Sequence, residues 1–79
     1  MFKVRILTPQ SAIYLGLATE VVLPSKDGEI SVLDFHQPII SRLCPGTINI
    51  DKKWFFDIKD GVAYLGDDEL KVIVEEARK

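Results

Sequence analysis

The segment GEISVLDFHQPII, residues 28–40, holds the side chains of this chain best suited to chemistry. It contains the acid Asp34 and, two residues later, His36, the only histidine of the chain. An imidazole can act as a general base near neutral pH when a partner orients it. A plain turn needs Gly, Asn, Asp or Pro, and it does not need Phe35, His36 and Gln37 in succession. The segment could therefore be a catalytic loop, a docking surface or a wide bend.

The rest of the sequence supplies no partner for catalysis at this loop. Catalysis requires a nucleophile, base or metal held against an oriented group, and the signatures GxSxG, HExxH, GxxxxGK[ST] and GxGxxG do not occur. The single Cys44 excludes an internal disulfide, and free cysteine is most often a small buried residue. The acidic run at residues 67–69 is typical of a solvated turn rather than a calcium loop. We therefore predict no catalytic residue, no cofactor and no metal site.

Size and charge narrow the class of protein further. The 79 residues make one domain with a thin core, and 47% apolar and 28% charged residues are typical of a soluble globular domain. No apolar run approaches the roughly 20 residues that span a bilayer. The first residues lack the apolar block of a signal peptide, so we expect a cytosolic protein. A net charge of −2 without a concentrated basic stretch weighs against nucleic-acid binding.

The elements that position the loop are predicted to be strands throughout. Short alternating segments are separated by turn signals roughly every 7 to 10 residues, which indicates an all-β, two-sheet sandwich or barrel of about nine or ten short strands. Hairpin tips are expected at residues 51–52 and 59–61, and residues 75–79 have helical propensity. The expected strands cover residues 2–7, 12–15 (ended by Gly16), 17–23, 29–33, 39–43, 47–50, 54–58, 62–65 and 70–74.

The aromatic run Trp54, Phe55 and Phe56 has two interpretations. Successive strand residues point to opposite faces, so Trp54 and Phe56 should share a side and Phe55 should face the other way. Such a cluster could stack nucleic-acid bases, although in a thin sandwich aromatics more often fill the core or an interface. From the residues alone, a protein-interaction adaptor and a small oligonucleotide-binding barrel both stay open.

Several stretches in a fixed order point to a known family. They are ILTPQ, EVVLPSKDGEISVL, ISRLCPGTINI and LKVIVEEA. The most specific pattern is G-E-[hydrophobic]-x-V-L-x-x-H-x-P, formed by Gly28, Glu29, Ile30, Ser31, Val32, Leu33, His36 and Pro38. This order resembles the amino-terminal β-sandwich domain of the epsilon subunit of the F-type ATP synthase, over residues 1–79. The alternative is an unrelated β-sandwich adaptor that binds another protein through the same loop.

The resemblance implies a ten-stranded sandwich in the central stalk of that enzyme. Its function would be that of a non-catalytic rotor subunit, which couples ion-driven rotation of the c ring to the gamma subunit during ATP synthesis. The implied partners are the gamma subunit and the c ring, with no nucleic acid and no direct small-molecule substrate. The membrane would be reached only through the complex, at the cytoplasmic face of an energy-coupling membrane such as the bacterial inner membrane.

The resemblance also implies where the two partners bind. Thr8, His36 and Ser41 would lie on the gamma-facing side, and the loop of Asp27, Gly28 and Glu29 would face the c ring. A gripping interface needs an apolar patch with a polar rim. The expected patch members are Val32, Phe35 and Ile40, and the expected rim charges are Glu29 and Arg42. On this interpretation, residues 28–40 form a docking element.

The chain departs from the family's pattern at three places. Asp34-Phe35 stand where the family usually has Pro-Gly, and Gln37 stands where it has Ala, so another turn is expected around His36. Asp60-Gly61 replace the usual Ser-Gly-Gly. The family commonly continues into two helices that can restrain ATP hydrolysis, and these 79 residues contain no such hairpin. The sequence therefore assigns no inhibitory or nucleotide-binding role to these residues.

Overall fold

Ten strands make up the computed structural model, which describes residues 1–33 and 38–78. This confirms the prediction of an all-β sandwich. Within the described ranges, no helix has the length and hydropathy of a membrane span. The strands are β1 (Phe2–Leu7), β2 (Ala12–Ala18), β3 (Glu20–Ser25), β4 (Gly28–Leu33), β5 (Ile39–Leu43), β6 (Gly46–Ile50), β7 (Trp54–Ile58), β8 (Gly61–Gly66), β9 (Glu69–Val74) and β10 (Ala77–Arg78).

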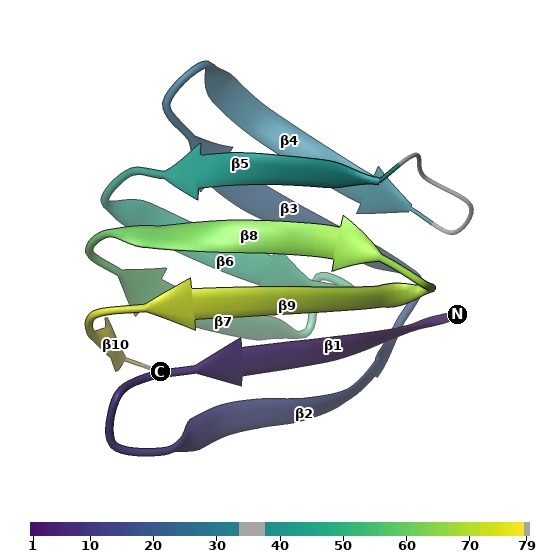
Figure 1. Ribbon diagram of the computed structural model, residues 1–79, viewed down its shortest axis with the longest axis horizontal. Helices are drawn as coiled ribbons and strands as arrows, with labels where there is room; N and C mark the ends of the chain where they lie inside the picture. Colours follow the sequence, from purple (N-terminus) through teal and green to yellow (C-terminus); the bar gives the residue numbers. More distant parts are fainter. Residues whose placement is uncertain (34–37, 79) are drawn as a thin grey trace.

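The strands are arranged in two layers (Figure 1). The front layer has the order β5-β8-β9-β1-β2, and the back layer has the order β4-β3-β6-β7-β10. Neighbouring strands are antiparallel except β1 and β9, which are parallel. A single pairing, between Ser25 of β3 and Leu43 of β5, joins the two layers into one continuous sheet. The sandwich is therefore a single sheet folded back on itself.

The core lies between the layers because alternate residues of each strand point inward. In β1, for example, Phe2, Val4 and Ile6 are buried while the residues between them are not. Each large aliphatic side chain that is fully removed from water stabilises the fold by about 1.5–3 kcal/mol. The buried hydrophobic residues are Phe2, Val4, Ile6, Ala18, Val21, Leu23, Val32, Leu43, Ile48, Ile50, Phe56, Ile58, Ala63, Leu65, Leu70, Val72 and Val74.

The predicted hairpin tip at residues 51–52 is confirmed. It connects β6 to β7, and Lys53 N donates a hydrogen bond to Ile50 O at 3.0 Å. Asp51 and Lys52 have φ values of 53° and 57°, the positive values of the central residues of a type I′ turn, within a three-residue loop because Ile50 pairs with Trp54. Residues 67–68 also have positive φ values and form a two-residue turn between β8 and β9, because Gly66 pairs with Glu69. Asp is one of the few non-glycine residues that adopt this left-handed conformation at small cost.

At three places tertiary pairing overrides a local signal, and at the first two the predicted boundary is wrong. Gly16 does not end a strand, since β2 continues through it to Ala18 and pairs with β1 along this length. Residues 59–61 do not form a hairpin tip, because β7 lies in the back layer and β8 in the front layer. Residues 77–78 form β10 beside β7 rather than the start of a helix.

The β6–β7 turn is fastened to the corner between β2 and β3 by one carboxylate. Asp51 Oδ1 accepts hydrogen bonds from Thr19 N (2.9 Å), Thr19 Oγ1 (2.8 Å) and Glu20 N (2.8 Å). Burial alone would raise the pKa of Asp51, but these hydrogen bonds and the nearby charge of Lys53 outweigh it, so the pKa is lowered. The carboxylate therefore stabilises the fold most when it is ionised.

Replacing this carboxylate should weaken the fold more than replacing a matched aspartate. Asp51→Ala should lower the free energy of unfolding by about 1–2 kcal/mol more than Asp67→Ala, because Thr19 and Glu20 lose an acceptor. Asp67 is the matched control since it also stands first in a turn and has a positive φ, of 50°. Urea unfolding at neutral pH measures the difference.

The difference should also depend on pH. The folded pKa of Asp51 lies below the unfolded value, so the stabilisation is complete above the unfolded pKa, about 3.9, and is lost as the pH falls through the folded pKa. Equal losses for the two variants, or a difference that stays constant into the acid range, would contradict this role for Asp51.

Candidate functional site

The outer face of β5, β8 and β9 carries an unusual number of apolar side chains. Outward-facing Ile40 is 70% exposed, and its neighbours across the front layer are Tyr64 (47%) and Ile73 (46%). Val62 pairs with Ile73 on the same outer face and is half-buried. We call Ile40, Val62, Tyr64 and Ile73 the β5–β9 patch. Outer positions of a sandwich are usually polar, so such a patch is typical of a surface that another protein covers.

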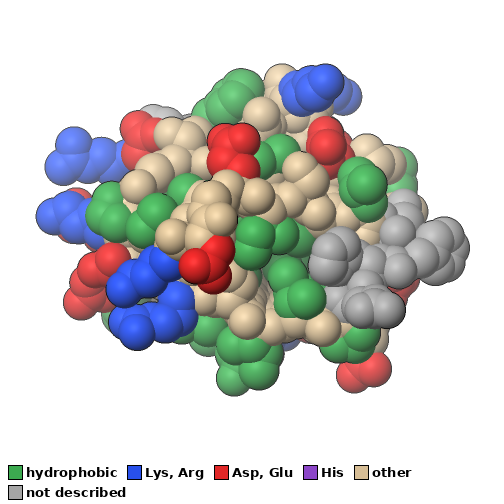
Figure 2. Space-filling model, turned by 90° about the horizontal axis from the view of Figure 1, so that it is seen from above, with side chains coloured by type: hydrophobic (Ala, Val, Ile, Leu, Met, Phe, Trp, Pro, Cys, Tyr) green, Lys and Arg blue, Asp and Glu red, His purple; other side chains and the backbone are tan. Residues whose placement is uncertain are grey.

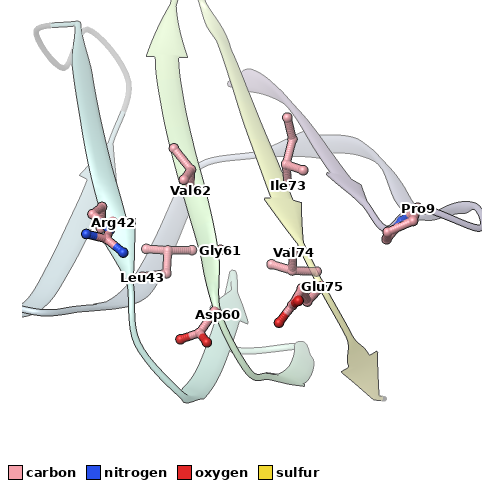
Figure 3. Close-up of a pocket in the computed structure, with 9 residues that line it drawn as sticks. All are labelled: Pro9, Arg42, Leu43, Asp60, Gly61, Val62, Ile73, Val74 and Glu75. Atoms are coloured by element: carbon pink, nitrogen blue, oxygen red, sulfur yellow. The ribbon is translucent and has the colours of Figure 1, made fainter.

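A shallow hollow of about 310 Å³ opens beside this patch (Figure 3). Val62 of β8 and Ile73 of β9 contribute to its apolar lining, and Pro9 reaches it from the loop between β1 and β2. Arg42 stands at its β5 side, while the carboxylates of Asp60 and Glu75 lie near the ends of the strands (Figure 3). An apolar floor with charges of both signs around it suits an inserted apolar side chain with polar neighbours.

The floor of the hollow depends on a close approach of β8 to β9. A Cβ atom added at Gly61 would lie 2.6 Å from Ile73 O and 2.7 Å from Val74 Cγ1. No side chain fits this space without moving the β9 backbone. Gly61, predicted to belong to a turn, is thus needed because two strands meet there.

The structure divides the residues predicted for β5 between two faces. Ile40 and Arg42 point outward, at the patch and at the hollow. Ser41, which lies between them, pairs with the buried Ala63 and is half-buried, on the side that faces the other layer. The alternation of a strand therefore places Ser41 away from the surface formed by its neighbours.

Val32 requires a correction. It was predicted to belong to the apolar patch that contacts the gamma subunit, but its side chain is 0% exposed and lies in the core. Its pairing partner on β3, Val21, is also fully buried, so both side chains point between the layers. Val32 can therefore support β4 but cannot contact a partner.

Thr8 organises the loop that brings Pro9 to the hollow. Its Oγ1 accepts hydrogen bonds from Gln10 N (3.3 Å) and Ser11 N (3.1 Å) and donates one to Ser11 O (3.1 Å). Thr8 N donates a second bond to Ser11 O at 2.8 Å. Because the hydroxyl is engaged within its own loop, Thr8 acts on this surface by shaping the turn.

The residues predicted to face the c ring share one exposed turn between β3 and β4. Asp27, Gly28 and Glu29 are all exposed, and Asp27 N is held by Ser25 Oγ at 3.0 Å. Gly28 has φ 108°, a conformation that other residues rarely adopt. The turn lies at one end of the sandwich, the same end as the β1–β2 loop (Figure 1). Of the predicted gamma-facing residues, Phe35 and His36 lie outside the described residues.

The aromatic run follows the predicted alternation. Trp54 and Phe56 both lie against Tyr14, with ring centroids 6.5 Å and 5.8 Å away. Phe56 is buried, whereas Phe55 is 51% exposed on the outer face of the back layer. Trp54 and Phe56 thus pack against Tyr14 of β2 at the edge of the core. Phe55 supplies a single apolar side chain on the outer face of the back layer.

Sequence reasoning missed most residues of this surface, namely Pro9, Asp60, Val62, Tyr64, Ile73 and Glu75. A signal for Ile73 was present, because Val72, Ile73 and Val74 form an unbroken apolar run where a strand with one wet face should alternate. Seen from above, over β4 and β5, acidic and basic side chains are interspersed with apolar ones in the described part of the surface (Figure 2). This side of the sandwich therefore has mixed charge.

No group of three or more His, Cys, Asp or Glu residues in the described ranges could hold a metal ion.

The fold and this surface define a class of small β-sandwich domain with an apolar outer face and exposed turns at its ends. The chain belongs to the family described as "ATP synthase, Delta/Epsilon chain, beta-sandwich domain", which matches residues 1–79.

Similar proteins carry consistent names. The chain is 32% identical over 78 residues to the "ATP synthase epsilon chain" of Rippkaea orientalis, covering 95% of this chain and 57% of that protein. It is 34% identical over 80 residues to the "ATP synthase epsilon chain, plastid" of Prototheca wickerhamii, covering 98% and 60%. The chain thus spans 57% to 60% of the length of these two relatives.

Solved structures share the fold at lower identity. A chain of the Euglena gracilis mitochondrial ATP synthase, in a structure of OSCP, F1 and c-ring, aligns with a TM-score of 0.84 and 18% identity, covering 95% of this chain and 51% of that one. A chain in the central stalk and c-ring structure of the Tetrahymena thermophila enzyme aligns with a TM-score of 0.81 and 15% identity, covering 98% and 65%. Both likenesses show the same sandwich architecture.

The close approach at Gly61 gives a test of how the hollow is built. Gly61→Ala should lower the free energy of unfolding by about 1–3 kcal/mol, because the new methyl group must displace the β9 backbone. Gly66→Ala, at the other end of β8, is the matched control, since a Cβ there meets no described atom within 4 Å. Thermal or urea unfolding compares the two. Equal stability of both variants would show that the β9 backbone moves at little cost in free energy and that Gly61 is not required.

Proposed function

We propose that this chain is the β-sandwich domain of a non-catalytic central-stalk subunit of an F-type ATP synthase. In this role it couples ion-driven rotation of the c ring to the gamma subunit during ATP synthesis. The observation that carries the proposal is the family match over all 79 residues, supported by relatives named ATP synthase epsilon chain. The domain contributes contacts rather than bond-making chemistry, and it reaches the cytoplasmic face of the membrane only through the complex.

The gamma subunit would bind the β5–β9 patch and the hollow beside it. A coupling domain has to resist torque, which requires apolar anchors that exclude water inside a polar rim. Ile40, Tyr64 and Ile73 are exposed apolar candidates for the anchors. Arg42, with Asp60 and Glu75 across the hollow, would provide charges that fix the orientation.

The c ring would contact the exposed β3–β4 turn. Asp27 and Glu29 present two carboxylates there, and the positive φ of Gly28 gives the turn a shape that few other sequences can take. This turn lies at an end of the sandwich, whereas the β5–β9 patch lies on its outer face (Figure 1). One rigid domain could therefore hold both partners at once.

Gamma binding should depend on the patch and not on the opposite face. Tyr64→Asp places a charge in the patch and should weaken binding to purified gamma at least tenfold, which is about 1.4 kcal/mol. Phe55→Asp is the matched control, because Phe55 is similarly exposed on the outer face of the back layer. Titration calorimetry measures both. If the unmodified chain did not bind gamma, or if Phe55→Asp weakened gamma binding equally, this assignment would be wrong. If the chain preferred an unrelated protein, the adaptor function would be favoured instead.

The two proposed contacts should separate by mutation. Glu29→Lys reverses a charge at the turn and should reduce retention of the gamma–chain assembly on detergent-solubilised c ring several-fold, with stronger effects at low salt. Binding to gamma alone should be unchanged. Tyr64→Asp should show the reverse pattern, in which binding to gamma alone is already weakened. If Glu29→Lys impaired gamma binding and left c-ring retention intact, the turn would have been assigned to the wrong partner.

A further inference from the structure

β2 forms an edge of the front layer and differs from most natural edge strands. Among the described residues it pairs with β1 alone. Its sequence, AIYLGLA, contains no charged residue and no proline. Edge strands are usually protected by such residues because their free backbone groups can pair with another chain. On β2, Leu15 and Leu17 are 63% and 56% exposed, so the edge is apolar as well as unpaired.

The exposed leucines of β2 form a surface separate from the β5–β9 patch. Across the front layer, Leu17 lies opposite Lys3 and Leu15 lies opposite Arg5. Arg5 is paired with Glu69 of β9 at 3.3 Å. A band of charged side chains therefore separates the leucines from the patch. A shallow hollow of about 270 Å³ lies between the leucines and this band, lined on one side by both leucines and Gly16 and on the other by Lys3, Arg5 and Glu69.

The regular part of the edge is held in shape from inside. The pairing of β1 with β2 shifts between Ile6 and Leu7, which leaves Tyr14–Ala18 as the undistorted stretch. Tyr14 lies along its own strand over Gly16, where an added Cβ would come within 3.1 Å of the Tyr14 hydroxyl oxygen. The Tyr14 ring also packs edge-on against Phe56 at 5.8 Å. The edge is therefore a formed template that needs little further ordering before it pairs.

We propose that β2 is an interface between two copies of this chain, paired antiparallel about a two-fold axis at Gly16. In this register Leu15 of each copy lies opposite Leu17 of the other, so four leucines gather on the outer face. On the inner face each Tyr14 lies opposite the small Ala18. The strand thus complements itself, as a two-fold interface requires, and no like charges meet.

The dimer should be weak and dependent on concentration. A single edge pairing buries less surface than the roughly 1,200–2,000 Å² of standard stable interfaces. The pairing leaves the β5–β9 patch free, because that patch lies across the charged band. The proposal therefore does not rest on the rotor function, and dimerisation can be tested with the isolated chain.

Sedimentation equilibrium over a roughly hundredfold range of concentration tests the proposal. The unmodified chain should shift from monomer to dimer, and Leu15→Lys should raise the dissociation constant at least tenfold. Ile40→Lys is the control, since Ile40 is a similarly exposed apolar residue on the other patch, and it should leave the dimer unchanged. Far-ultraviolet circular dichroism checks that each variant is folded.

Two results would overturn the inference. One is a chain that stays monomeric at the highest concentration, and the other is a dimer that Ile40→Lys disrupts as much as or more than Leu15→Lys. The register has its own test in a Cys44→Ser background. Leu15→Cys chains mixed with Leu17→Cys chains should form more disulfide-linked dimer than either variant alone. Stronger cross-linking of Leu15→Cys to itself would contradict the axis at Gly16.

Discussion

The alternation of side chains along paired strands is the constraint on which this molecule depends. Inward positions such as Val4, Leu23 and Val72 fill the single space between the layers, and they are fully buried. Because each layer is a single sheet, every other residue of a strand must face outward, whatever its type. Apolar residues at outward positions, such as Tyr64 and Ile73, therefore remain on the surface. The same constraint that builds the core also builds the surface that we assign to a partner.

The outer face of the front layer is organised as two apolar surfaces on either side of a charged band. One is the β5–β9 patch with its hollow, and the other is the β2 edge with Leu15 and Leu17. The ion pair of Arg5 with Glu69 stands between them. The exposed β3–β4 turn adds a third surface at one end of the sandwich. A small domain can thus face several neighbours at once, as a coupling element between two partners must.

Much of the fold followed from sequence because local chemistry determines it. Asp51 could be assigned to a turn, since Asp tolerates the left-handed backbone that this turn requires. Gly61 could not be placed correctly, because its role is a close approach to β9, a tertiary contact. The strand at residues 77–78 likewise depends on the free edge of β7. Among the residues predicted for the candidate site, Ile40 and Arg42 face outward, whereas the orientation of Val32 and Ser41 depended on register with β3 and β8.

The claim at the centre of this account is that a partner covers the outer face of β5, β8 and β9. It is tested most directly by recording amide and methyl NMR spectra of the labelled chain while unlabelled gamma subunit is added. The account predicts that signals of Ile40, Val62 and Ile73 shift or broaden first, while those of Val22 and Asn49 on the back layer stay unchanged. Changes confined to the back layer, or none at saturating gamma, would contradict it.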